Sequence, residues 1–234
     1  MKVLILPDIH GRSFWKEAVK KHLDDCDKVV FLGDYLDPYG HEGIDYYEAM
    51  SNFAQIINFA DENREKVVLL IGNHETHYIS NDAEIGSRYS RLHSSEIQEL
   101  LMDDIDMFKV AYECTINDKR FLFTHAGVVD LWYNRHKDII GELSADNLNK
   151  LINGERDNYG MLSEIGRERG GWLECGGPMW ADIYEHIRNK PIEGIYQIFG
   201  HTQLKDKPYI ADNFACLDCR KAFILNNEGK IIEV

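Results

Sequence analysis

The chain has 234 residues, 44% of them hydrophobic, which is enough to bury the core of one large α/β domain. Its formal net charge of −14 argues against non-specific binding to nucleic acid, because the phosphates would be repelled. No apolar run is long enough to span a membrane, the cysteines are odd in number, and a strand follows Met1-Lys2 directly, so we expect a reduced, cytoplasmic protein without a signal peptide.

Apolar runs alternate with helical patterns in the first seventy residues. The runs predict strands at 2–6, 29–32 and 66–71. Apolar residues at helical spacing predict helices at 14–23, where Ser13 is the expected N-cap, and at 44–59. Because a helix separates each strand from the next, this order predicts a parallel sheet.

The alternation of strand and helix patterns is interrupted twice, by polar or glycine-rich segments that we expect to cap the strand ends. These cap segments cover about 76–107 and 128–194, with helices expected at 95–102 and 145–152. The remaining patterns predict a hairpin with strands at 108–116 and 120–123, strands at 195–199, 214–217 and 222–225, and a last hairpin around 226–229. No linker interrupts the chain, so we expect a single domain over 1–234.

Five of the apolar runs are followed by residues of metal-ligand type. These residues are Asp8 and His10, Asp34, Asn73 and His74, His125, and His201. Ligands in open α/β sheets bind where strands end, so five such strand ends predict one site with Asp34 at its centre. Asp8 and His10 are two apart and therefore point to the same side.

The predicted ligands are carboxylates, imidazoles and one amide. They are Asp8, His10, Asp34, Asn73, His125 and His201. Mixed oxygen and nitrogen ligands favour Mn²⁺, with Fe, Zn²⁺ or Ni²⁺ as alternatives, over Ca²⁺. Six ligands are too many for one catalytic ion with an open position. Shared between two ions about 3.5–4 Å apart, they leave room for a bridging water.

His74 follows Asn73 and need not be a ligand itself. A protonated imidazole there could donate its proton to a leaving alkoxide, and Asp37 could hold it in its charged form. The other histidines are expected on the surface or in loops, namely His22, His41, His77, His93, His136 and His186.

The motifs together resemble those of the calcineurin-like metallophosphoesterases, in particular the phosphoprotein (Ser/Thr) phosphatase branch with its small bacterial and phage members. They are Asp8-Ile9-His10-Gly11, Gly33-Asp34-Tyr35-Leu36-Asp37, Gly72-Asn73-His74-Glu75, His125-Ala126-Gly127 and Gly200-His201-Thr202. Met179-Trp180-Ala181-Asp182 is similar to the Trp-Ser-Asp segment of that branch.

The resemblance implies a four-layer αββα sandwich of two mixed β-sheets flanked by helices, with a dinuclear metal centre. It assigns Asp8, His10 and Asp34 to one metal, and Asp34, Asn73, His125 and His201 to the other. It also gives His74 the proton-donor place and Asp37 that of its partner.

The chain departs from the family motif Gly-Asp-x-x-Asp-Arg-Gly, because Pro38 and Tyr39 stand where arginine and glycine would be. One phosphate-clamping arginine is therefore missing from its usual place. Arg12 is our candidate replacement, and Arg88 and Arg91 are weaker ones. The family's second arginine is not assigned among Arg156, Arg167, Arg169 and Arg188.

From these residues we expect a hydrolase: a metal-dependent phosphatase that cleaves phosphomonoesters by attack of a water bridging two metal ions. Its substrate would be a phosphorylated protein or a small phosphoester. The alternatives are a phosphodiesterase or dinucleoside polyphosphate hydrolase with the same dinuclear site, and an inactive scaffold. The complete ligand set and His74 argue against the scaffold.

Overall fold

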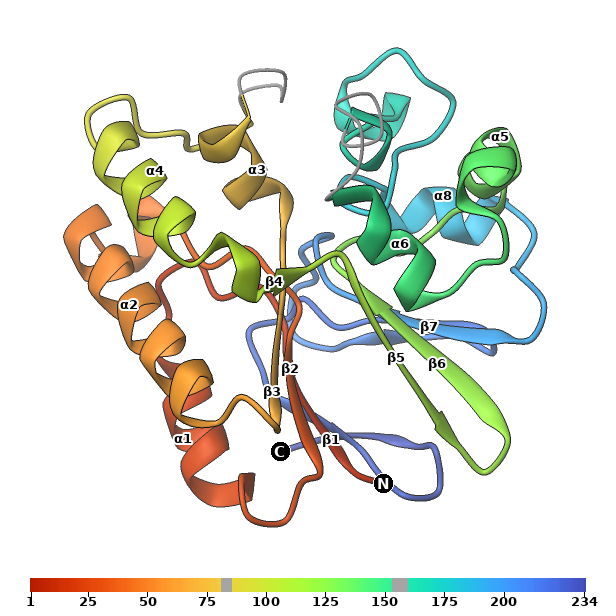
Figure 1. Cartoon of the computed structure of the whole chain (residues 1–234), viewed down its shortest axis with the longest axis horizontal. Helices are drawn as coiled ribbons and strands as arrows, with labels where there is room; N and C mark the ends of the chain where they lie inside the picture. The colour runs from red at the N-terminus through yellow and green to blue at the C-terminus, as the bar shows by residue number, and fades with distance from the viewer. Residues whose placement is uncertain (81–85, 153–159) are drawn as a thin grey trace. The chain divides into compact units, whose positions relative to one another are not determined.

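The computed structural model describes residues 1–80, 86–152 and 160–234. It divides into two units, each with its own β-sheet and helices (Figure 1). Unit 1 consists of Met1–Phe108 and Arg220–Val234, and unit 2 of Lys109–Cys219. The single domain over 1–234 stays a prediction.

The sheet of unit 1 has the strand order β11-β10-β1-β2-β3-β4. Its strands are β1 (Val3–Leu6), β2 (Lys28–Phe31), β3 (Val67–Leu70), β4 (Phe108–Lys109), β10 (Phe223–Leu225) and β11 (Ile231–Glu233). The pairs β1–β2 and β2–β3 are parallel, as predicted, with Leu6 opposite Phe31 and Phe31 opposite Leu69. Strand β10 runs antiparallel to β1 and to β11. The carboxyl ends of the three parallel strands therefore lie at one edge of this sheet.

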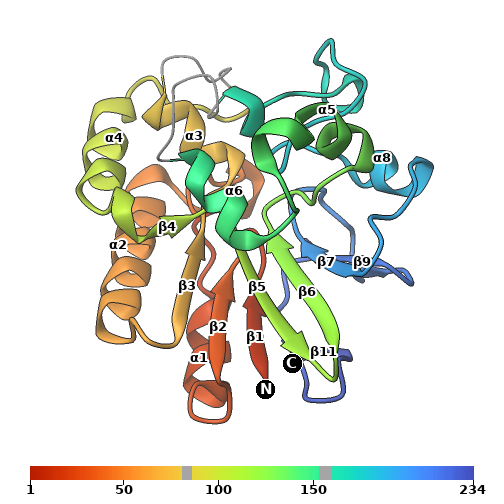
Figure 2. The ribbon, with the colours of Figure 1, turned by 45° about the vertical axis from the view of Figure 1, so that its right-hand side comes forward.

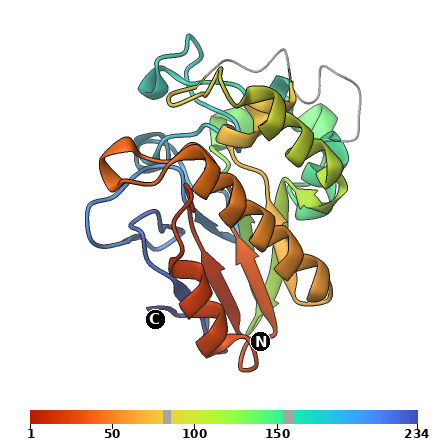
Figure 3. The same ribbon diagram turned by 90° about the vertical axis from the view of Figure 1, so that its left-hand side faces the viewer.

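Two amphipathic helices pack on this sheet, α1 (Phe14–His22) and α2 (Tyr46–Glu62), and Figure 3 shows them side by side. The ring of Trp15 in α1 contacts Phe59 of α2 and Phe31 of β2, so it packs α1 against both the second helix and the sheet. The carboxylate of Asp45 accepts a hydrogen bond from the backbone N–H of Glu48, which makes Asp45 the N-cap and starts α2 at residue 46. The other helical segments of unit 1 are η1 (Gly40–Glu42), α3 (Asn73–Ile79), α4 (Ser94–Asp103) and η2 (Ile105–Met107).

The sheet of unit 2 has the order β5-β6-β7-β9-β8 (Figure 2). Its strands are β5 (Ala111–Ile116), β6 (Lys119–Thr124), β7 (Ile195–Phe199), β8 (Tyr209–Ile210) and β9 (Phe214–Cys216). Strands β5 and β6 form the predicted hairpin, whose turn residues Asn117 and Asp118 both have positive φ. Strand β6 is parallel to β7, and β7 to β9. Between β6 and β7 the chain forms α5 (Asp130–Ile140), α6 (Ala145–Ile152), η3 (Arg167–Arg169) and α8 (Ile183–Arg188).

The predicted α/β fold, with two mixed sheets and flanking helices, is confirmed. One strand boundary was wrong, because the predicted strand at 108–116 is two strands, β4 and β5. The side-chain oxygen of Asn149 accepts hydrogen bonds from the backbone N–H groups of Val110 and Ala111, at 2.8 and 2.9 Å. Within the described ranges, no helix has both the length and the apolar composition needed to cross a bilayer.

Candidate active site

Each of the three parallel strands of unit 1 leads into a predicted ligand. Asp8 and His10 follow β1, Asp34 follows β2, and Asn73 follows β3 as the first residue of α3. These four side chains are buried, with exposed fractions of 1% or 2%. Carboxylates this deeply buried need compensating partners, and a bound cation is one that would supply them.

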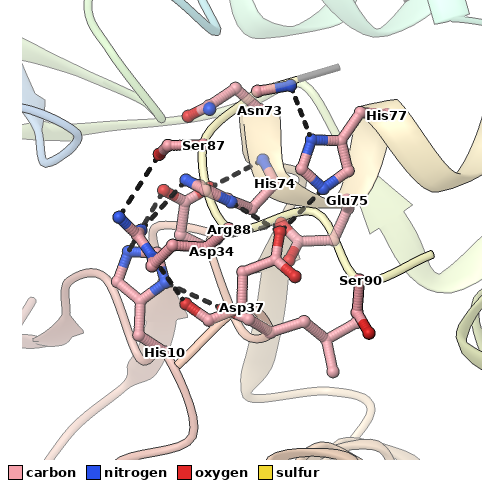
Figure 4. Close-up of polar contacts among 12 residues, drawn as sticks. His10, Asp34, Asp37, Asn73, His74, Glu75, His77, Ser87, Arg88 and Ser90 are labelled. Carbon is pink, nitrogen blue, oxygen red and sulfur yellow. Dashed lines mark hydrogen bonds and ion pairs between the residues drawn. The ribbon is translucent and has the colours of Figure 1, made fainter. Parts of the chain in front are cut away.

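His10, Asp34 and His74 form a cluster in which one ligand atom from each lies within 4.8 Å of the others (Figure 4). His10 Nε2 is 3.5 Å from Asp34 Oδ2, and the rings of His10 and His74 meet edge to face with centroids 5.0 Å apart. The structure thus brings two of the predicted ligands and the predicted proton donor together.

The loops after β1 and β2 hold unusual backbone conformations. His10, Asp34 and Asp37 have φ of 46°, 54° and 55°, in the left-handed region that residues other than glycine seldom adopt. The backbone N–H of His10 donates to the carbonyl of Asp34 at 2.7 Å, which ties the two loops together. Backbone conformations of this kind cluster at functional sites of proteins.

Glu75 was not predicted as a site residue, yet it fixes the position of Asp34. Its carboxylate accepts hydrogen bonds from the backbone N–H groups of Gly72, Asp34 and Tyr35, at 2.9, 2.9 and 2.8 Å. A Cβ on Gly72 would overlap the Asp34 side chain, so only glycine allows this approach of the β2 and β3 ends. The sequence pattern that could have identified Glu75 is a glutamate at the third position of a helix that starts directly after a strand.

His10 presents Nε2 to the cluster. Its Nδ1 donates to the carbonyl of Leu36 at 2.8 Å, and because a carbonyl only accepts, Nδ1 carries the proton. Burial lowers the pKa of His10 to about 3, with His74 and the Arg88 guanidinium adding to the effect against the opposing charge of Asp34. His10 is therefore a neutral imidazole with a lone pair on Nε2, the form that binds metal ions.

His74 and Asp37 form the pair that the sequence predicted as proton donor and partner. His74 Nδ1 lies 2.7 Å from Asp37 Oδ2, and both side chains are buried. Burial alone would lower the pKa of His74, but the carboxylates of Asp34 and Asp37 outweigh it and raise the pKa above its ordinary value. The geometry leaves Nε2 of His74 as the nitrogen that faces the cluster.

Two further side chains bind Asp37, and sequence reasoning missed both. His77 Nε2 lies 2.7 Å from Asp37 Oδ2, and the Tyr78 hydroxyl donates to Oδ1 at 2.5 Å. Burial would raise the pKa of Asp37, but the hydrogen bonds from His74 and His77 reverse the effect and lower it. The expectation that His77 lies on the surface was wrong, because every residue of α3 up to Tyr78 is buried.

The arginines near this cluster differ in what they contact. Arg12 forms a two-point ion pair with Glu42, at 2.7 and 3.0 Å, and donates to the backbone carbonyl of Asp8 at 3.1 Å. Arg88 Nη2 lies 3.1 Å from His74 Nε2 and 3.4 Å from His10 Nε2 (Figure 4). Arg91 is exposed. The substrate-binding role of Arg12 stays a prediction.

Unit 2 holds the other two predicted ligands at its own strand ends. His125 follows β6 and His201 follows β7, and because these strands are parallel neighbours the two imidazoles meet. His125 Nε2 is 3.1 Å from His201 Nδ1, and both side chains are buried. His201 has φ of 64°, in the same left-handed region.

Arg169 is the arginine beside the His125–His201 pair. Its Nη2 donates to the Thr202 hydroxyl at 2.8 Å, and its Nε lies 2.8 Å from a carboxylate oxygen of Asp182. Asp182 belongs to the Trp180-Ala181-Asp182 segment, and the Trp180 ring lies 5.8 Å from that of His201. Of the other three arginines considered from the sequence, Arg167 and Arg188 are exposed, and Arg156 lies outside the described residues.

His186 was also expected on the surface, and this was wrong. It is buried, its ring stacks on Phe199 at 4.5 Å, and its Nε2 is 3.0 Å from the carbonyl of Ala126. Burial lowers its pKa to about 4, so it is a neutral packing residue in a helix too short to show an amphipathic pattern.

The donors in unit 1 fit a divalent cation. A carboxylate oxygen of the buried Asp34 lies 3.5 Å from Nε2 of His10, which carries the lone pair. Asp8, which follows β1 as His10 does, supplies a second buried carboxylate. Mixed carboxylate and imidazole ligation is typical of Mn²⁺, Fe and Zn²⁺ sites. Asn73 offers a neutral amide oxygen, and His125 and His201 of unit 2 offer imidazole nitrogens.

A family model of calcineurin-like phosphoesterases matches residues 1–205. Among solved structures, a protein serine/threonine phosphatase from Saccharomyces cerevisiae with similarity to human phosphatase PP5 is 12% identical, with a TM-score of 0.59 over 100% of this chain and 79% of that one. The phosphoesterase Yfce from E. coli is 15% identical, with a TM-score of 0.42 over 100% of this chain and 98% of that one. None of the curated proteins matches the sequence.

The similarity to the Saccharomyces cerevisiae phosphatase shows a shared fold and, at 12% identity, nothing beyond it. The family model spans most of the chain, and the strand-end residues of both units fall within it. The chain therefore belongs to the calcineurin-like phosphoesterases.

Proposed function

We propose that the protein is a dinuclear metal-dependent phosphatase that hydrolyses phosphomonoesters, in the manner of Ser/Thr protein phosphatases. The observation that carries this proposal is the contact between two buried pairs. His74 is held by Asp37 at 2.7 Å and lies against His10, which faces Asp34. A metal-ligand pair beside a fixed, proton-bearing imidazole has the parts that hydrolysis of a phosphoester needs.

Asp8, His10 and Asp34 would hold one cation. Asp34, Asn73, His125 and His201 would hold the second, and this part of the proposal rests on the sequence motifs. When bound, divalent cations would activate a water as the nucleophile and stabilise negative charge on the phosphoryl oxygens. We propose Mn²⁺ as the metal, with Fe, Zn²⁺ or Ni²⁺ as alternatives.

His74 acts on the leaving group. With Nδ1 bonded to Asp37, Nε2 is the nitrogen that would donate a proton to the departing alkoxide. Asp37 is itself held by His77 and Tyr78, so its carboxylate is fixed in direction and remains ionised. This arrangement keeps the imidazole of His74 oriented and favours its charged form.

The charge of the chain and its departure from the family motif bear on the substrate class. The net charge of −14 favours a phosphorylated protein or a small phosphoester over nucleic acid, and a cytoplasmic location remains part of the proposal. The second candidate is a phosphodiesterase or dinucleoside polyphosphate hydrolase, because the motif arginine that would clamp a monoester is replaced by Pro38. The His74–Asp37 pair argues against an inactive scaffold.

The test is a substrate panel on protein that has been chelated and then loaded with Mn²⁺. The panel contains p-nitrophenyl phosphate, bis-p-nitrophenyl phosphate, a phosphoserine peptide and diadenosine tetraphosphate. We expect no activity after chelation and, after reloading, faster hydrolysis of the monoesters than of the other two. Asp34→Asn, which removes the carboxylate charge at nearly constant shape, is the matched control and should bind less metal. Full activity in protein shown to be metal-free by elemental analysis would reject the proposal.

A further inference from the structure

Arg88 brings a positive charge to the His10–His74 cluster from a segment that contains none of the family motifs. Its Nη2 lies 3.1 Å from Nε2 of His74, the nitrogen that would face the leaving group, and 3.4 Å from Nε2 of His10. Figure 4 shows the guanidinium directed at these two imidazoles. The motif arginine is missing at position 38, and a guanidinium reaches the cluster from position 88 instead.

Several contacts hold this guanidinium in place. Its Cζ lies 3.8 Å from the centroid of the Tyr39 ring, and its Nε donates to the backbone carbonyl of Asp37 at 2.9 Å. The Tyr46 hydroxyl donates to the carbonyl of Arg88 itself, and Arg88 adopts φ of 62°. Tyr39 stands where the family motif has glycine, so one of the two departures from the motif supplies the ring on which Arg88 packs.

Arg88 and Arg12 differ in how their charges are compensated by the described residues. In the part of the chain that the structure describes, Arg88 makes no ion pair, whereas Arg12 is bound at two points by Glu42. It donates to a carbonyl and a hydroxyl, packs on an aromatic face, and lies within 3.4 Å of the two imidazoles. Among the described residues, the positive charge of Arg12 is thus compensated by a carboxylate and that of Arg88 is not, so Arg88 is the arginine placed to attract an anionic substrate.

We propose that Arg88 binds the non-bridging oxygens of the substrate's phosphoryl group and selects terminal phosphomonoesters over diesters. This inference rests on the proposed function, because it assigns Arg88 to the same reaction. A guanidinium offers parallel N–H donors that match two oxygens of one phosphate. A monoester dianion presents three non-bridging oxygens and up to two charges, whereas a diester presents two oxygens and one charge, so a monoester gains more from Arg88.

The test compares Arg88→Ala and Arg88→Lys with wild type, all loaded with Mn²⁺. Arg64→Ala is the control, because it removes another arginine of unit 1 that is exposed and whose ion pair, among the described residues, is with Asp61. For Arg88→Ala we expect kcat/KM for p-nitrophenyl phosphate to fall by about 10- to 100-fold, the range of a charge-assisted hydrogen bond. The loss for bis-p-nitrophenyl phosphate should be smaller. Arg88→Lys should recover only part of the loss, because an ammonium has no planar fork.

Calorimetric binding of inorganic phosphate gives a readout that does not depend on turnover. We expect the Kd for phosphate to rise about 10-fold or more in Arg88→Ala, with metal content and thermal midpoint unchanged. If wild type hydrolyses no ester but phosphate binding still depends on Arg88, the proposed function fails, the selection of monoesters fails with it, and only the assignment of Arg88 to phosphate binding stands. Equal losses for monoester and diester, or unchanged phosphate affinity, would overturn the inference and leave the proposed function intact.

Discussion

Replacing His74 with asparagine separates proton transfer from metal binding. The side-chain amide nitrogen of asparagine can occupy the position of histidine Nδ1, so the hydrogen bond to Asp37, 2.7 Å long in wild type, should survive. Only Nε2 is removed, together with its proton. We therefore expect His74→Asn to keep its metal content and its fold while it loses the ability to protonate a leaving group.

The size of the loss should depend on the leaving group. Positioned proton transfer contributes about 10²–10⁴-fold, or about 2.7–5.5 kcal/mol of transition-state stabilisation, when the leaving group is a poor one such as a serine alkoxide. Nitrophenolate leaves without a proton, so its release should slow much less. The assay is kcat for a phosphoserine peptide and for p-nitrophenyl phosphate, with the bound metal measured in the same samples.

Two results would refute this reasoning. Equal losses for both substrates at unchanged metal content would mean that His74 does not protonate the leaving group. Loss of metal together with activity would make His74 a ligand, which its place in the cluster with His10 and Asp34 also permits. His77→Asn is a useful comparison, because His77 binds the same carboxylate of Asp37, and it should change kcat only through Asp37.

Three further substitutions test the surroundings of the site. Asp37→Asn removes a charge that raises the pKa of His74, so the alkaline limb of the kcat–pH profile should move to lower pH; an unmoved limb would contradict the pairing. Glu75→Ala leaves three buried N–H groups without an acceptor and should lower the free energy of unfolding in urea by about 3 kcal/mol or more, whereas a change under 1 kcal/mol would contradict its structural role. Arg12→Ala should raise KM for monoesters if Arg12 binds the phosphate. If Arg12 only forms the ion pair with Glu42, the substitution should lower the free energy of unfolding and leave KM unchanged.

The sequence was most informative where one physical signal dominated. Strands β1, β2 and β7 are wholly or almost wholly buried, and an apolar run in the sequence predicts strands of this kind. The predicted ligands follow these strands directly, so locating the strand ends also gave the positions of Asp34 and His201. The β10–β11 hairpin was equally accessible, because its turn residues are of the kind that reverse a chain.

Other elements carried no such signal. Helix α3 is buried on every side and composed largely of polar residues, so it has no amphipathic period for a sequence pattern to reveal. Strand β8 consists of two exposed residues, and only its pairing with β9 defines it. The contacts of Asp37 with His77 and Tyr78 depend on how α3 is oriented, which is a tertiary property. Arg88 lies 50 positions from the motif gap at Pro38, and only the folded chain shows the two together.

The left-handed backbone at His10, Asp34, Asp37 and His201 has a consequence for protein engineering. Each such residue costs the folded state roughly 1–2 kcal/mol that glycine would not, although aspartate tolerates this region better than most residues. A directed-evolution campaign scored on melting temperature alone would therefore favour glycine at four of the proposed site residues. If the proposed function holds, thermostabilised descendants would keep their activity only if these four positions were excluded from the library.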